Sequence, residues 1–389
     1  MKIIQITTFY HPVTGGVESQ VEEIAQLLTE KGHNVKVFTT NSSRQGHGKI
    51  AQINSEIKNI PVKRYRTLFS VSKFHKIAPS MLLGLLNEDF DILHVHGFRK
   101  FEVYTALLAA KLKGKKVVVT THNPFTTNIR SQNLEYLVKF HDLTLGKIFS
   151  KYLDKIIALL PTEIPILHDK FNVPEDKIQV IPNGIKNHFW EKIEFNKQKF
   201  LNKILEKSDK KPDKNNWDHV ILATCRLNEV KGLQNLKLAS DKLKNCLFLF
   251  IGGDDGYKKQ LMSIYRNNSN VAITGSYILR TEIRKAYQIA DVFVLPSLHE
   301  PFGLTPVESV ASGTPVIATN VGGPKHVLSE DYAIFLNPNN QELWHKNIKK
   351  LLTNNDLRTK YIKLGQKDVE KYRWEKIIQR IIKLYEQLA

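Results

Sequence analysis

The sequence predicts an α/β protein made of two Rossmann-like, doubly wound domains that face a central cleft. Short apolar runs typical of buried parallel strands alternate with stretches whose apolar residues recur at helical spacing. This alternation stops in the polar segment 186–217 and then starts again. The chain of 389 residues is also too long for one ordinary core and suits two.

The first repeat of the pattern shows why each element is expected. An isoleucine-rich strand over residues 3–6 leads into a loop over 11–16. Apolar residues then recur at helical spacing over 17–28, and Gly32 is a natural residue to end that helix. The next strand is expected over 34–40.

The same reading locates the remaining strands. In the first half they are expected at residues 91–96, 116–121, 155–160 and 177–181. In the second half they are expected at residues 219–224, 247–251, 271–275, 291–296, 315–319 and 333–336. The tail, 374–388, has the apolar spacing of an amphipathic helix.

These elements divide the chain into an N-terminal domain over residues 1–190 and a C-terminal domain over 218–375. The segment 191–217, rich in Lys, Asn and Asp, is expected to be a linker or insert. The final helix, about 376–389, is expected to pack back on the first domain. Ligands bind at the carboxyl ends of strands in such sheets, so the cleft is the expected site.

The net charge of +19 favours an anionic partner, either nucleic acid, an anionic membrane surface or a diphosphate ligand. The excess of basic residues is spread over both halves. No nucleic-acid-binding module or localised basic stripe is recognisable, so nucleic acid is not an expected partner.

Residues 1–10 begin as a strand, with no basic region or cleavage site, and no apolar window reaches the roughly 18–20 residues that a spanning helix needs. We therefore expect a cytoplasmic protein. Cys225 and Cys246 lie in apolar runs and are expected to be reduced core thiols. His94 and His96 lack further ligands to complete a metal site, so no metal is expected.

Two loops carry candidate anion-binding groups. Gly15 and Gly16 stand at a helix start, where backbone N–H groups favour an anion, although such a pair can also be a plain turn. Arg226 and Lys231 follow a buried strand. They can converge on one diphosphate, and the alternative is a solvated basic loop.

The strongest signal lies over residues 295–308. Glu300 and Glu308 bracket a strand-to-helix turn that exposes the backbone N–H groups of Phe302, Gly303 and Leu304.

The E-x7-E spacing of the two glutamates, the R-L-x3-K-G motif from Arg226 and the G-G-V-E loop from Gly15 resemble glycosyltransferase family 4. Further motifs extend the resemblance over nearly the whole chain, at residues 94–97, 121–122, 181–184, 290–297, 321–323 and 374–375. The resemblance implies a GT-B fold and a retaining enzyme that uses a nucleotide-diphosphate sugar without a metal or other cofactor.

It also implies roles for particular residues. Four are catalytic: Arg226 and Lys231 neutralise the departing diphosphate, Glu300 binds hydroxyls of the transferred sugar, and His122 lies beside that sugar. The donor-binding residues are Gly15, Gly16, Phe302, Gly303, Leu304 and Glu308, the last on the nucleoside ribose. Departures from the family pattern at Cys225, Lys186 and 324–326 leave the nucleotide base and the sugar open.

The expected function is therefore transfer of a hexosyl group from a UDP- or GDP-sugar to a glycan or lipid-linked acceptor bound by the first domain. The alternatives are a sugar-nucleotide epimerase or a phosphorylase on the same fold, or a nucleic-acid-binding protein. Basic segments of the first domain suggest docking on an anionic membrane, and an ordinary solvated basic face would explain them equally well. They are residues 62–69, 73–76, 99–100 and 111–116.

Overall fold

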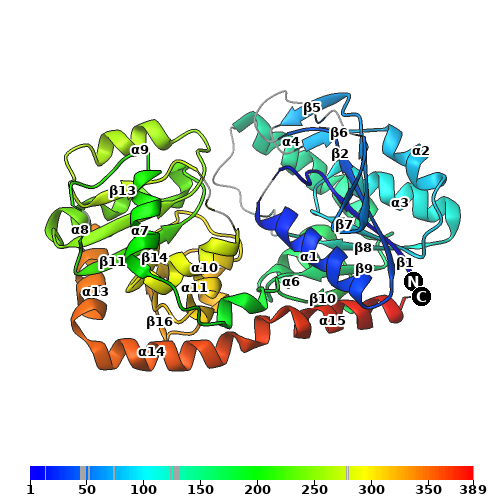
Figure 1. Ribbon diagram of the computed structural model, residues 1–389. Helices are drawn as coiled ribbons and strands as arrows, with labels where there is room; N and C mark the ends of the chain where they lie inside the picture. The colour runs from blue at the N-terminus through cyan, green and yellow to red at the C-terminus, as the bar shows by residue number, and fades with distance from the viewer. Residues whose placement is uncertain are drawn as a thin grey trace. The chain divides into compact units, whose positions relative to one another are not determined.

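The computed structural model describes residues 1–13, 15–43, 50, 53–72, 75–122, 125, 132–214, 216–276, 278 and 280–388. The chain forms two compact units (Figure 1). Unit 1 comprises Met1–Gly184 and Glu375–Ala389, so both ends of the chain belong to it, and unit 2 comprises Ile185–Trp374.

Unit 1 is built on an eight-stranded sheet in the order β10-β9-β8-β7-β1-β2-β4-β3. All neighbouring strands are parallel except the edge pair β3 and β4. The strands are β1 (Lys2–Thr7), β2 (Asn34–Thr40), β3 (Asn54–Ile57), β4 (Ile60–Tyr65), β7 (Ile92–His96), β8 (Lys116–Thr120), β9 (Lys155–Ala158) and β10 (Ile178–Val180). The chain starts in the middle and winds outward in both directions, the doubly wound arrangement.

The helices of unit 1 connect these strands. They are α1 (Gly16–Glu30), α2 (Ser80–Leu86), α3 (Phe101–Lys113), α4 (Gln132–Leu143), α5 (Leu145–Ser150), α6 (Glu163–Pro165) and most of α15 (Trp374–Glu386). A separate hairpin pairs β5 (Phe69–Ser72) with β6 (His75–Ile77). One face of the central strands carries Ile4, Leu93 and Val95 into the apolar core that includes α2 and α3. The alternate positions of β1 and β7 hold Gln5, His94 and His96, which are also buried.

Unit 2 has a six-stranded, all-parallel sheet in the order β13-β12-β11-β14-β15-β16. Its strands are β11 (His219–Thr224), β12 (Cys246–Ile251), β13 (Val271–Ile273), β14 (Val292–Leu295), β15 (Val316–Thr319) and β16 (Ala333–Leu336). Its helices include α7 (Lys197–Glu206), α8 (Lys237–Lys242), α9 (Lys258–Ile264), α10 (Arg280–Ile289), α11 (Leu304–Ala311), α12 (Pro324–Val327), α13 (Gln341–Thr353) and α14 (Asn355–Asp368). Because both faces of the sheet are covered, its strands are apolar throughout rather than alternating.

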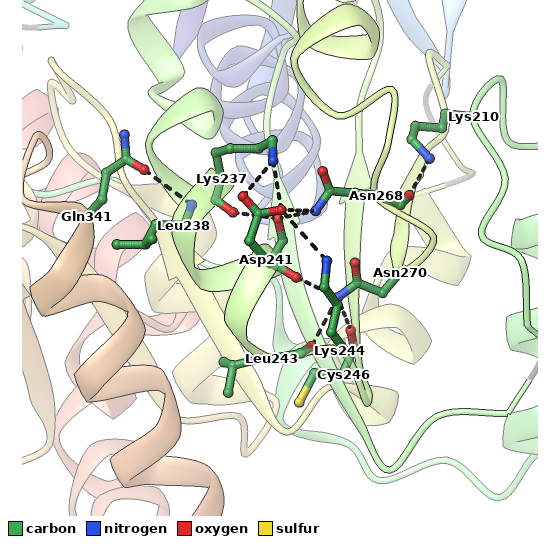
Figure 2. A network of polar contacts seen from close by, with 11 residues as sticks. Lys210, Lys237, Leu238, Asp241, Leu243, Lys244, Cys246, Asn268, Asn270 and Gln341 are labelled. Carbon is green, nitrogen blue, oxygen red and sulfur yellow. Dashed lines mark hydrogen bonds and ion pairs between the residues drawn. The ribbon is translucent and has the colours of Figure 1, made fainter.

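A polar network fixes α8 at the amino ends of these strands (Figure 2). The amide Nδ2 of Asn270 donates to three backbone carbonyls, including that of Cys246, each at 3.0 Å. Asp241 accepts from the side chains of Lys237 and Asn268. The network gives partners to backbone carbonyls that would otherwise be buried without them.

The predicted fold class of two Rossmann-like, doubly wound domains is confirmed. The segment predicted as a linker, 191–217, belongs to unit 2 instead. It carries α7, whose residues Phe200, Leu201 and Ile204 are buried, so this helix is a packed part of unit 2. Within the described part of the chain, no helix is long and apolar enough to cross a bilayer.

Candidate active site at the carboxyl edges of the two sheets

The loop after β11 places Arg226 and Lys231 at the carboxyl edge of the unit 2 sheet. The Asn228 side chain accepts from the backbone N–H of Lys231 at 3.2 Å and begins the short 3-10 turn over Glu229–Lys231. Gly232 follows with φ +67°, and a Cβ there would lie 1.9 Å from the carbonyl oxygen of Pro296. The loop therefore packs directly against the end of β14, which only glycine permits.

Lys231 reaches the residue predicted to bind the sugar. Its Nζ lies 2.6 Å from Oε2 of Glu300, and the two side chains are only 15% and 12% exposed. Glu300 lies after β14, and its backbone carbonyl accepts from Gly323 N–H at 2.8 Å. A Cβ at Gly322, which has φ +76°, would lie 2.2 Å from that same carbonyl oxygen. Two glycines of the loop after β15 thus hold Glu300 against Lys231.

Arg226 also has a carboxylate partner. Its Nη1 lies 2.7 Å from Oδ2 of Asp255, which follows β12, and Asn228 donates to the same oxygen at 3.1 Å. Both cations of the predicted diphosphate clamp are therefore charge-compensated within unit 2. An incoming anion would exchange with these carboxylates rather than meet bare cations.

The turn before α11 has the predicted strand-to-helix form. Gly303 has φ +98°, and α11 begins at the next residue. Phe302 is buried and makes an edge contact with Tyr372. About one helical turn into α11, Glu308 accepts from the hydroxyl of Tyr287 at 2.8 Å.

Three of the predicted side chains of unit 2, those of Arg226, Lys231 and Glu300, lie around Cys225. Burial raises the pKa of this thiol to about 12, and the charges of Lys231, Glu300 and Arg226 also act on it. Cys225 is half-buried directly after β11, where it packs against the apolar core of unit 2 and borders the charged cluster. Burial likewise raises the pKa of Tyr287, with a further contribution from Glu308. The structure thus brings Arg226, Lys231, Glu300 and Glu308 to one edge of one sheet.

Unit 1 holds the other predicted residues at the carboxyl edge of its own sheet. Gly15 and Gly16 stand between β1 and α1, and Gly16 is the first residue of that helix. His122 follows β8 with φ +49°, an unusual backbone conformation for a histidine. Its Nε2 lies 3.1 Å from Nδ1 of His96. Burial, and then the charge of Lys100, lower the pKa of His122 to about 3.

Sequence reasoning missed Asp255 and Tyr287. Asp255 stands at the end of an apolar strand in a Gly-Gly-Asp-Asp-Gly turn. Asp255 has the feature that marks Arg226, a charged residue shortly after a buried strand, so the sequence does carry a signal for it. Tyr287 gave no such signal, because it lies inside α10 and only packing brings its hydroxyl to Glu308.

The predicted basic face of unit 1 needs a correction. Arg64, Lys76 and Arg99 are buried. The Nε and Nη2 atoms of Arg99 donate to the two carboxylate oxygens of Asp142, at 2.8 and 2.6 Å. The hydrogen bonds of these three side chains lie within unit 1, so they are not part of an exposed basic surface. Two residues of the same predicted face, Lys73 and Phe74, lie outside the described residues.

Two Rossmann-like units, each with a glycine-bounded loop and polar side chains at its carboxyl edge, make up the GT-B fold. Residues 14–188 match the family model described as Glycosyltransferase Family 4. Residues 205–368 match the model described as Glycosyl transferases group 1. The chain belongs to glycosyltransferase family 4 and is a transferase enzyme.

Relatives extend over the whole chain. An uncharacterized glycosyltransferase of Methanocaldococcus jannaschii is 26% identical over 99% of this chain and 98% of its own length. The phosphatidylinositol N-acetylglucosaminyltransferase gpi3 subunit of Schizosaccharomyces pombe is 23% identical over 99% of this chain and 80% of its own. The fold matches that of the Anabaena protein HepE, solved with UDP-glucose, with a TM-score of 0.75, 17% identity and full coverage of both chains.

Proposed function

We propose that this enzyme transfers a hexosyl group, with retention of configuration, from a UDP- or GDP-sugar to a glycan or lipid-linked acceptor. The observation that carries the proposal is the contact between Lys231 and Glu300 beside Arg226. A cation for the diphosphate and a carboxylate for sugar hydroxyls lie within one hydrogen bond of each other. They match the two parts of a nucleotide-diphosphate sugar that meet at the bond to be broken.

The chemistry follows from charge. Cleavage of the bond between sugar and phosphate leaves negative charge on the diphosphate and develops positive charge on the sugar. Lys231 would leave Glu300 for a phosphate oxygen, and the released Glu300 carboxylate would accept from sugar hydroxyls. Arg226 would offer its planar fork, and the N–H groups at the start of α11 would add fixed dipoles. With these groups in place no metal ion is required in the proposal, and no other cofactor is invoked.

The relatives support the two substrates in general terms. HepE is solved with UDP-glucose, which favours a nucleotide-sugar donor here. The fission yeast relative is named for transfer to phosphatidylinositol, which favours an acceptor carried by a lipid. Retention and independence from metal rest on the family resemblance.

A thermal-shift panel of UDP, GDP, ADP and their sugars, with and without EDTA, would identify the donor. We expect one nucleotide and its sugars to raise the melting temperature, equally in EDTA. A panel in which none stabilises the protein would refute the donor assignment. Product analysis with and without acceptor then separates a transferase from an epimerase or a phosphorylase, since only the transferase needs an acceptor.

Substitutions test the assigned roles. Arg226→Ala or Lys231→Ala is expected to lower kcat roughly 10²–10³-fold, the usual effect of losing one charge-stabilising donor. Glu300→Ala should impair transfer, whereas Glu308→Ala should chiefly weaken nucleotide binding. Equal nucleotide affinity in wild type and the Glu308 variant would contradict that division.

We further propose a cytoplasmic enzyme that docks on the inner face of an anionic membrane through α4. Tyr136, Phe140 and Leu143 recur along one side of this helix and are 70%, 67% and 68% exposed. Lys139 on the same helix has a side chain that is 60% exposed and forms an ion pair with Glu135 one turn before it, at 3.4 Å. A row of exposed apolar side chains with a lysine beside it suits the boundary of an anionic bilayer.

Cosedimentation with liposomes tests this docking. We expect Phe140→Asp to reduce binding to anionic liposomes. The matched control is Leu83→Asp, on α2, where the exposed fraction of 64% is similar. Equal binding of wild-type protein to anionic and neutral liposomes would rule out the membrane proposal.

A further inference from the structure

A chain of buried hydrogen bonds runs through unit 1 from α15 to His122. Oε1 of Gln5 lies 2.6 Å from Nε2 of His96, and Nδ1 of His96 lies 3.1 Å from Nε2 of His122. At its other end, the Gln5 amide donates to the Tyr385 hydroxyl at 3.2 Å. That hydroxyl lies 2.6 Å from Nδ1 of His94. Gln5, His94 and Tyr385 have no exposed surface, and His96 is 2% exposed.

With its oxygen facing His96 and its nitrogen facing Tyr385, the Gln5 amide sets the direction of the protons in this chain. Its carbonyl oxygen can only accept, so the proton of His96 is on Nε2. Burial lowers the pKa of His96 well below its ordinary value, so the ring is neutral and its Nδ1 is an acceptor. His122 must then donate from Nε2, and its other nitrogen, Nδ1, carries no proton.

The same reasoning accounts for the other branch. Tyr385 accepts from the Gln5 amide, so its own proton goes to Nδ1 of His94. His94 is neutral as well, because burial lowers its pKa to about 3, and it donates from Nε2 to the hydroxyl of Thr120 at 2.7 Å. Each member thus has one consistent role.

We infer that Gln5 and His96 are positioning residues that hold His122 as a neutral hydrogen-bond acceptor, with Tyr385 of the C-terminal helix anchoring the chain. This inference deepens the proposed function and rests on it for the purpose of the arrangement. A neutral ring with a free lone pair can accept from a sugar hydroxyl. An imidazolium at the same place would oppose the positive charge that develops on the sugar.

The surroundings of His122 support this assignment. The titratable groups described beside it are His96 and His94 of β7 and Lys100 before α3, and none of these is an acid that would favour the cation. The preceding residue, Thr121, is fixed by two hydrogen bonds: its N–H donates to Ile157 O at 3.0 Å and its hydroxyl donates to Glu163. These bonds help to hold His122 in its left-handed backbone conformation.

The protons can be observed directly. Two-bond 15N–1H correlation spectra of histidine-labelled protein distinguish the two neutral tautomers from the cation, and His122→Asn assigns the signal. We expect His122 to carry its proton on Nε2 from about pH 5.5 to 8. In Gln5→Leu, His96 loses its acceptor, and we expect the His122 proton to appear wholly or partly on Nδ1.

Substitution at His96 separates positioning from packing. His96→Phe removes the acceptor and should scramble the His122 tautomer. His96→Asn places an amide oxygen near the position of Nδ1 and should restore it in part. Tyr385→Phe should give an intermediate effect. Thr39→Val, a buried hydroxyl on β2 outside the chain, is the matched control and should leave the tautomer unchanged.

Kinetics provide the second readout. Gln5→Leu and His96→Phe should lower kcat roughly 10–100-fold, the usual scale for outer partners that orient a functional group, with a smaller change in donor KM. His96→Asn should recover part of the loss. If His122 keeps its proton on Nε2 in both Gln5→Leu and His96→Phe, the inference is wrong. Absence of sugar transfer by the wild-type enzyme would instead overturn the proposed function, and the tautomer result would stand.

Discussion

The contact between Lys231 and Glu300 allows a quantitative prediction that depends on the structure alone. We consider Lys231→Met and Glu300→Gln, which keep side-chain size and remove one charge each. Either change leaves the opposite charge in a site where its side chain is only 15% or 12% exposed. We therefore expect each single variant to be destabilised, and the double variant to be destabilised by less than the sum of the two single effects.

The magnitude follows from the geometry. At 2.6 Å and an effective dielectric constant of about 20, the attraction between two unit charges is about 6 kcal/mol. Removal of both groups from water and loss of side-chain freedom offset much of this. A double-mutant cycle should therefore give a coupling free energy of about 1–3 kcal/mol between Lys231 and Glu300.

The chain offers a convenient probe for this measurement. All four tryptophans, Trp190, Trp217, Trp344 and Trp374, belong to unit 2. Their fluorescence during urea unfolding therefore reports the unit that contains the pair, separately from unit 1.

The matched control cycle uses Lys242 and Glu342, which form an exposed pair in the same unit at 2.9 Å. Solvent screening should make its coupling too small to detect beside that of Lys231 and Glu300. If the two cycles give equal coupling, the reasoning about burial is wrong. A ligand adds a second consequence: Glu300→Gln frees Lys231 and should tighten nucleoside-diphosphate binding several-fold while sugar transfer falls.

Three further predictions concern single positions. Burial raises the pKa of Glu163 from 4.5 to about 7, so its ionisation favours the unfolded state. The stability that this carboxyl contributes should be fully present below about pH 4.5 and be lost as the pH rises to 7. The free energy of unfolding of the Glu163→Gln variant should then exceed that of wild type by up to about 3 kcal/mol at pH 8 and equal it at pH 4.5. Calorimetry of the full chain can measure this in the transition of unit 1, and identical pH profiles would count against it. Gly232→Ala, which requires a Cβ 1.9 Å from a carbonyl oxygen at positive φ, should lower the unfolding midpoint of unit 2 and kcat together, and a fully stable, active variant would show that the loop can move. Tyr287→Phe removes the hydroxyl on Glu308 and should weaken nucleotide affinity less than Glu308→Ala does, as titration calorimetry can measure; a larger loss would reverse their proposed order.

Much of the candidate site could be predicted because its residues stand next to elements with strong local signals. Arg226 follows an apolar run, and Glu300 and Glu308 bracket a Gly-containing turn at a helix start. Residues that directly follow the strands of a parallel sheet lie together at its carboxyl edge. The bounds of β2, β11 and β16 were predicted to the residue because local apolar runs mark these strands.

The sequence by itself determined the periodicity of strands and helices, the glycines at strand-to-helix turns and the types of charged residue that follow them. All of these depend on neighbours within a few positions of the chain. Only the tertiary structure decided that Asp255 pairs with Arg226, that Arg99 is buried on Asp142, and that Tyr385 completes a chain with residues of β1 and β7. These contacts join residues 29 to 380 positions apart, and no local pattern encodes which of many similar side chains will meet once the core has packed.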